Sequence, residues 1–199
     1  MARLRAPERR LQILETAVEL FSRFGYRGTT TAELAKAAGV TEPILYRHFE
    51  NKLDLFVTLV DAVGEEVITG WEEALSDITN PRERLQTLLA SNPASHRRGK
   101  GMYRVIIHAM SEVESAPELS KPLRRHLNRL HGFIRDEITS LQDAGAIRKD
   151  ASPDMLARFL MDVAIGFGMT SPLGIRGQSL TSAKNSMQEL LNDILTKKK

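Results

Sequence analysis

Apolar residues recur at intervals of three and four along most of this 199-residue chain, and no segment alternates apolar and polar residues as a strand does. Between residues 8 and 24, for example, Leu14, Val18 and Phe21 fall on one face of a helix whose opposite face is charged. Glycine and proline divide the chain into about nine such segments. The sequence therefore predicts an all-α fold of about nine helices with no sheet.

The ends of these helices are indicated by capping residues and helix breakers. We expect helices over about residues 8–24, 30–38, 42–49, 51–78, 82–91, 102–115 and 118–144, one that starts near residue 153, and a last one around residues 187–194. Pro93 and the Arg97–Gly101 segment are expected to interrupt the chain between two of them. Gly39 should end the second helix, with Thr41 as the cap of the third.

The amino-acid composition restricts the function of the chain less than the pattern of its residues does. The chain has no cysteine, which excludes disulfides, thiolate metal sites and a cysteine nucleophile. Its longest uncharged apolar stretch, residues 163–175, contains Pro172 and is shorter than a membrane span, and charges near the start interrupt any signal peptide. We expect a cytoplasmic protein with no membrane segment. The net charge of +3 permits nucleic-acid binding without requiring it.

Residues 34–49 have the spacing of two short helices joined by a turn that contains glycine, which is the general form of a helix-turn-helix. Ala35 and Ala38 are small enough for close helix crossing, and Leu45 and Phe49 can fill the junction with the first helix. The third helix would then present an outward surface of Glu42, Pro43, Ile44, Tyr46, Arg47 and His48. Spacing alone favours an ordinary helical core, because most helical hairpins do not bind DNA.

A longer ordered set of residues resembles the TetR family of regulators (TetR/AcrR type). It consists of Phe21, Gly25-Tyr26, Thr29-Thr30, Leu34-Ala35, Ala38-Gly39-Val40-Thr41, Leu45-Tyr46-Arg47-His48-Phe49 and Asn51-Lys52. The resemblance implies a DNA-binding domain at residues 7–67, with the motif at about 30–49, and a C-terminal effector-binding and dimerisation domain at residues 68–199. It implies a ligand-responsive regulator, most simply a repressor, that binds a palindromic operator as a dimer.

The resemblance also implies roles for individual residues. Thr30, Tyr46, His48 and Lys52 are expected near phosphates, and Thr41, Glu42, Pro43, Ile44 and Arg47 near base edges. Such roles are physically reasonable, since Arg47 can form two hydrogen bonds with guanine and Ile44 can contact a thymine methyl group. Pro43 departs from the family, which commonly has glycine or another small residue there.

Two apolar stripes near the C-terminus suit a two-fold dimer, and TetR-like proteins dimerise in this region. The stripes consist of Phe159, Leu160, Val163 and Phe167 on one helix and Met187, Leu190, Leu191 and Ile194 on the other. The alternative is that both stripes pack inside their own chain.

In the family the middle helices enclose the pocket of a small-molecule effector. Candidates that would suit an apolar effector are Trp71, Met102, Ile106, Met110, Phe133 and Met161, although each could be ordinary core. We expect no cofactor and no metal ion.

Two other classes of protein, an enzyme and a helical adaptor, fit the sequence less well. For an enzyme, the chain lacks a recognisable set of catalytic or metal-binding residues. His126 and His131 are five residues apart and do not share one helical face, and His108 with Glu112 has no third metal ligand. No phosphate-binding glycine loop and no serine elbow motif is present. A helical adaptor could use the Arg97–Gly101 run or the Lys197–Lys199 tail for an acidic partner, but such runs are usually solvated. We therefore expect a DNA-binding regulator, not an enzyme.

Overall fold

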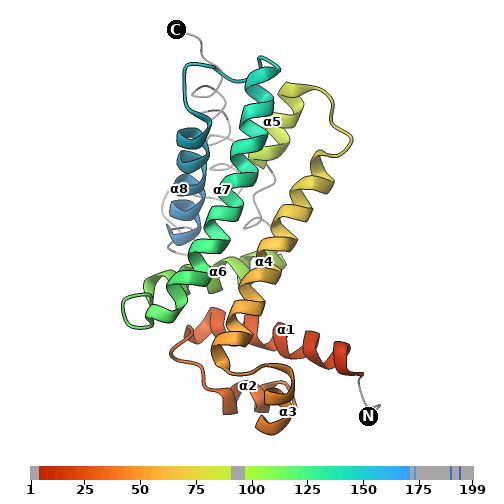
Figure 1. Ribbon diagram of the computed structural model, residues 1–199, viewed down its shortest axis with the longest axis vertical. Coiled ribbons are helices and arrows are strands. Elements are labelled where there is room, and N and C mark those ends of the chain that lie inside the picture. Colours follow the sequence, from red (N-terminus) through yellow and green to blue (C-terminus); the bar gives the residue numbers. More distant parts are fainter. Residues whose placement is uncertain (1–4, 91–96, 171–172, 174–188, 190–192, 194–199) are drawn as a thin grey trace. The chain divides into compact units, whose positions relative to one another are not determined.

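The computed structural model describes residues 5–90, 97–170, 173, 189 and 193. This part of the chain is all-helical, which confirms the predicted fold class (Figure 1). Its elements are α1 (Ala6–Phe24), α2 (Thr31–Ala37), α3 (Glu42–His48), α4 (Lys52–Leu75), α5 (Pro81–Ala90), α6 (Arg97–Ser111), the 3-10 helix η2 (Pro117–Leu119), α7 (Ser120–Asp143) and α8 (Pro153–Thr170). The predicted last helix, with Met187, Leu190, Leu191 and Ile194, lies outside the described residues.

Side-chain caps explain where several helices begin. The Asn51 side chain accepts a hydrogen bond from the backbone N–H of Asp54 at 2.9 Å, and Asn80 accepts one from that of Arg82 at 3.0 Å. Pro81 and Pro153 are the first residues of α5 and α8, where the missing N–H costs nothing. These caps place the starts of α4, α5 and α8 within two residues of the predicted positions.

The prediction of a break at Arg97–Gly101 was wrong, because these residues form the first turns of α6. The reason lies in helix packing. A Cβ at Gly101 would come 3.5 Å from Cγ1 of Val18 on α1, so this glycine lies where α1 and α6 approach closely. A glycine inside a helix usually weakens it, but here it allows two helices to meet.

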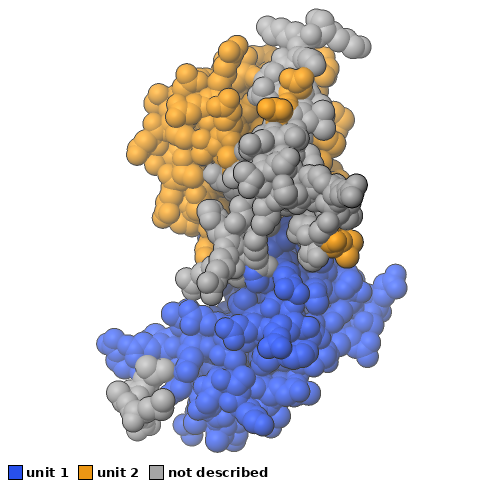
Figure 2. Space-filling view, turned by 180° about the vertical axis from the view of Figure 1, so that it is seen from behind, with its two compact units in different colours: residues 1–65, 97–126 blue, residues 66–96, 127–199 orange. Residues whose placement is uncertain are grey.

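The chain divides into two compact units (Figure 2). The first combines residues 1–65 with 97–126, and the second combines 66–96 with 127–199. The core of the first unit includes fully buried Ile13, Phe21, Leu34, Leu45 and Phe56. The N-terminal helices therefore share one core with α6 and the start of α7.

The second unit has its own apolar cluster, made of residues from α4, α5, α7 and α8. Arg84 on α5 forms two hydrogen bonds of 2.8 Å with the Glu137 carboxylate on α7, and a third of 2.8 Å with the carbonyl of Leu75. This ion pair anchors α5 to α7 and to the end of α4. No helix in the described ranges is long and apolar enough to span a membrane.

Candidate nucleic-acid interface

The helix α2 begins at a reciprocal cap between Thr30 and Glu33. The Thr30 hydroxyl accepts a hydrogen bond from the Glu33 backbone N–H at 3.2 Å, and the Glu33 carboxylate accepts hydrogen bonds of 2.8 Å from the backbone N–H and the hydroxyl of Thr30. These bonds hold the pKa of Glu33 below its ordinary value. The first turn of α2 is thereby fixed by Thr30 and Glu33, which are close together in sequence.

The turn between α2 and α3 depends on Gly39. Its φ of +65° lies in the left-handed region that favours glycine, and its backbone N–H donates to the carbonyl of Lys36 at 3.1 Å. The N–H of Val40 donates to the carbonyl of Ala35 at 2.9 Å, which completes a Schellman motif. Thr41 then precedes α3, as predicted, although its side chain makes no cap hydrogen bond.

This turn gives α3 a buried side and an outward side. Leu45 and the adjoining Phe49 are 0% and 1% exposed, whereas Tyr46 is 47% exposed and Arg47 is also exposed. Of the other predicted DNA-binding residues, Thr30, Thr41 and Pro43 are exposed, and Glu42, Ile44, His48 and Lys52 are partly buried. The seven-residue helix α3 is therefore attached to the core by one side only, and its outward side is available to a partner (Figure 1).

A hydrogen-bonded chain of three side chains connects α2 with α3. The Thr31 hydroxyl donates to Oε1 of Glu42 at 2.7 Å, and the Tyr46 hydroxyl donates to the Thr31 oxygen at 3.2 Å. Sequence reasoning did not find Thr31, because its partners lie 11 and 15 residues away. The three consecutive threonines have separate roles, since Thr29 is buried and donates to the carbonyl of Gly25 at 2.8 Å, and Thr30 caps α2.

Lys52 points to the turn that follows α1. Its ammonium donates to the carbonyls of Tyr26 and Thr29 at 3.0 and 3.1 Å, and it lies 4.4 Å from the centre of the Tyr26 ring. Burial lowers the pKa of Lys52, and the negative charges of Glu112 and Glu118 oppose this effect. Two of its three N–H donors are thus occupied by backbone carbonyls.

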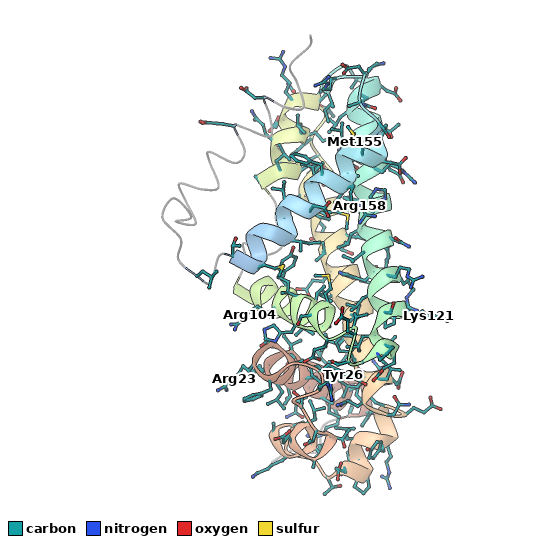
Figure 3. All side chains as sticks on the ribbon, turned by 90° about the vertical axis from the view of Figure 1, so that its left-hand side faces the viewer. Arg23, Tyr26, Arg104, Lys121, Met155 and Arg158 are labelled. Atoms are coloured by element: carbon teal, nitrogen blue, oxygen red, sulfur yellow. The ribbon has the colours of Figure 1, made fainter. Side chains whose placement is uncertain are left out.

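Tyr26 secures the same turn from inside. The residue is 6% exposed, and its ring packs edge-on against Phe56, with ring centres 5.2 Å apart, and at a tilt against Phe21, with ring centres 6.0 Å apart. Figure 3 shows Tyr26 among the packed side chains of the first unit, while nearby Arg23 projects outward. Arg10 adds a link between α1 and the end of α3, since its guanidinium lies 4.7 Å from the centre of the Phe49 ring.

The predicted effector residues fall into both units. Trp71, Phe133 and Met161 belong to the cluster of the second unit, where the Trp71 and Phe133 rings stack with centres 5.4 Å apart. The indole Nε1 of Trp71 is buried and has no hydrogen-bond partner among the residues that the structure describes. Ile106 and Met110 belong to the first unit, and the side chain of Met102 lies outside the described atoms.

The predicted dimer residues on α8 differ in exposure. Phe159 is 39% exposed, Val163 is partly buried, and Leu160 is 9% exposed and belongs to the cluster of its own unit. The side chain of Phe167 is not among those described. Met155, one turn before Phe159, is 59% exposed and was missed by the sequence analysis (Figure 3). Within the described ranges, no group of three His, Asp or Glu side chains could hold a metal ion.

Two family models match most of the chain. The model for bacterial regulatory proteins of the tetR family matches residues 13–59, and the model for the C-terminal part of BetI-type transcriptional repressors matches residues 81–196. The first match contains α2, the Gly39 turn and α3, and the second spans more than half of the chain.

Curated relatives and solved structures agree with these models. The transcriptional activator FasR of Mycolicibacterium smegmatis is 38% identical over 42% of this chain, and the match spans 38% of FasR, well under two thirds of its length. The nucleoid occlusion factor SlmA of Vibrio campbellii is 30% identical over 83% of both chains. A transcriptional regulator from Saccharomonospora viridis, solved in complex with choline, is 26% identical, with a TM-score of 0.77 over 94% of this chain and 95% of its own.

The family matches coincide with the geometry described above: a capped α2, a left-handed turn at Gly39 and a short α3 with one free side. The chain belongs to the TetR family of bacterial regulatory proteins.

Proposed function

We propose that this protein is a ligand-responsive transcriptional repressor that binds a two-fold symmetric operator as a homodimer and is released by a small-molecule effector. The observation that carries the proposal is the outward side of α3, where Tyr46 and Arg47 are exposed while Leu45 beside them is sealed in the core. A short helix held in this way can enter a major groove without disturbing the fold. Functionally, residues 7–67 bind DNA and residues 68–199 bind the effector and dimerise.

We propose the same DNA contacts for the residues that the sequence analysis singled out. Thr30, Tyr46, His48 and Lys52 contact phosphates, and Thr41, Glu42, Pro43, Ile44 and Arg47 lie near base edges. Phosphate contacts orient the duplex, and base contacts select its sequence. Arg47 is exposed and α3 ends one residue later, so its guanidinium can reach guanine without unfolding the helix.

Dimerisation supplies the second α3 that a two-fold operator requires. Phe159 and Met155 present exposed apolar surface on α8, which supports a contact between two copies of this helix. Phe159, Leu160, Val163 and Phe167 form this part of the proposed interface, and Met187, Leu190, Leu191 and Ile194 form the rest. Replacing Phe159 by Glu should turn the dimer seen by sedimentation into a monomer, and an unchanged dimer would reject this interface.

The effector is proposed to be largely apolar, with a hydrogen-bond acceptor for Trp71. The cluster around Trp71, Phe133 and Met161 is apolar, and within the described part of the chain the buried indole N–H of Trp71 has no hydrogen-bond partner. The effector role that the sequence predicts for Met102, Ile106 and Met110 stays a prediction. The choline bound to the regulator from Saccharomonospora viridis makes choline a compound to test beside apolar ones.

The test is binding to double-stranded DNA. We expect the protein to shift a palindromic fragment from upstream of its own gene, to bind a scrambled fragment far more weakly, and to lose affinity steeply as salt rises. Equal binding to both fragments at all salt concentrations would reject sequence-specific regulation. Addition of the effector should release the fragment.

The relationship to SlmA favours a second candidate, a role as a nucleoid occlusion factor. Both functions use the same DNA-binding surface, so binding alone does not separate them. A deletion strain does separate them: a repressor predicts increased transcripts beside the bound fragment, whereas nucleoid occlusion predicts altered placement of division relative to the nucleoid with those transcripts unchanged.

A further inference from the structure

The hydroxyl of Thr31, on α2, lies between two side chains of α3. A carboxylate can only accept hydrogen bonds, so the single Thr31 proton must go to Glu42 at 2.7 Å. The Tyr46 hydroxyl therefore donates to a lone pair of the Thr31 oxygen at 3.2 Å. Hydrogen bonding runs in one direction, from Tyr46 through Thr31 to Glu42.

This arrangement fixes the Glu42 carboxylate before any DNA arrives. A carboxylate on a surface helix normally rotates freely, but Oε1 is held by a short, charge-assisted hydrogen bond, and the residue is partly buried. Among the residues that the structure describes, no hydrogen bond to Oε2 is found. One acceptor oxygen is thus held in place by α2, and the other remains available to a partner.

Glu42 is the first residue of α3, and the first residues of a recognition helix are those that contact base edges. A carboxylate there is repelled by phosphates and by the N7 and O6 acceptors of guanine. On its own major-groove edge cytosine presents the N4 amino donor and no acceptor, whereas adenine presents the N6 donor next to the N7 acceptor. Cytosine is therefore the base that a fixed carboxylate selects.

We propose that Thr31 is a positioning residue of the reading surface, and that it aims Glu42 at the N4 amino group of a cytosine in each half-site. The inference rests on the proposed DNA-binding function and adds to it the base that is read and the residue outside α3 that controls the reading. Thr31 acts through Glu42 and needs no contact with the duplex itself.

The experiment begins with selection of duplexes from a random library by the wild-type protein, followed by affinity measurements on duplexes that vary at one symmetric position. We expect cytosine at that position to be preferred about 5- to 100-fold over the other bases. Thr31→Val removes the hydroxyl and keeps the shape, so it should reduce this preference at least about fivefold and leave the other positions unchanged. Thr31→Ser retains the hydroxyl and should therefore show the wild-type preference.

Glu42→Gln is a second variant, which changes the side chain that reads the base and leaves Thr31 on α2 unchanged. Its outward group becomes an NH2 donor in place of an acceptor oxygen, so the preference for cytosine, whose N4 amino group is itself a donor, should be lost. Thr139→Val is the matched control, since the Thr139 hydroxyl on α7 donates only to the backbone carbonyl of Arg135 at 2.9 Å. It should leave every preference unchanged. Thermal unfolding of each variant shows that it is folded.

The possible failures can be told apart. If the wild type selects a motif but Thr31→Val and Glu42→Gln keep its preferences, the inference is overturned and the proposed function stands. The same holds if Thr31→Val weakens all duplexes equally, because that is the effect of a purely structural residue. If the wild type selects no motif, the proposed function fails, and the inference fails with it.

Discussion

Glu112, the first residue after α6, accepts a hydrogen bond from the backbone N–H of Arg27 at 3.0 Å, across 85 residues of sequence. The same carboxylate occupies the space that a side chain at Gly25 would need, and Gly25 has a φ of +74° that favours glycine. The carboxylate of Glu112, which follows α6, therefore holds the turn between α1 and α2. Both residues lie in the same compact unit.

Replacing Glu112 by Ala should lower the free energy of unfolding by about 1 kcal/mol, because the N–H of Arg27 loses its acceptor. Urea denaturation measures this change. Glu114→Ala is the control, since Glu114 is exposed nearby and should change stability by less than about 0.5 kcal/mol. Equal effects of the two substitutions would show that the hydrogen bond to the turn contributes nothing.

Replacing Lys52 by Met should have two effects. The carbonyls of Tyr26 and Thr29 lose a charged donor, so the free energy of unfolding should fall by about 1–3 kcal/mol. If the third N–H contacts a phosphate, affinity should also fall for all duplexes alike, and the slope of log affinity against log salt should decrease by about 1. A slope identical to that of the wild type would contradict the phosphate contact. Lys121→Met, an exposed residue on α7, is the control.

The cap at Glu33 predicts a pH dependence of stability. Hydrogen bonds from Thr30 lower the pKa of Glu33 in the folded state, so between the folded and unfolded pKa values the unfolded chain binds more protons. The stabilisation is present above the ordinary value of 4.5 and is lost as pH falls through the lowered pKa. The difference in unfolding free energy between wild type and Glu33→Gln should therefore vanish in acid. A difference that is constant from pH 7 to pH 3 would contradict this assignment.

Trp71 predicts a property of the effector. It is the one tryptophan of the sequence, so intrinsic fluorescence reports on it directly. An effector that accepts a hydrogen bond from Nε1 should shift the emission, and Trp71→Phe should raise the effector concentration needed for DNA release about fivefold or more. DNA affinity without effector should not change. Release at the wild-type concentration would remove Trp71 from the effector site.

The sequence predicted the helices and the turn at Gly39 because those depend on local chemistry: capping side chains, a left-handed glycine and helical periodicity. The inward side of α3 followed in the same way, since Leu45 and Phe49 are separated by one helical turn. The outward residues could be named from a family resemblance, but their contacts could not.

The features that were missed depend on residues far apart in sequence. Thr31 with Glu42 and Tyr46, Lys52 with the Tyr26 turn, and Glu112 with Arg27 are tertiary contacts that no local pattern encodes. The break expected at Arg97–Gly101 failed for the same reason, because packing of α1 against α6 outweighs the low helix propensity of glycine. Local sequence patterns were enough to locate the outward side of α3. Tertiary packing determines how the side chains on it are held.

Arg47→Ala tests most directly whether the outward side of α3 reads bases. Affinities of wild type and variant are compared on the selected duplex and on its single-base variants at constant salt. The variant should lose about 1–3 kcal/mol of discrimination at one position in each half-site while the other positions keep theirs. Unchanged discrimination at every position would contradict the claim that α3 is the recognition helix.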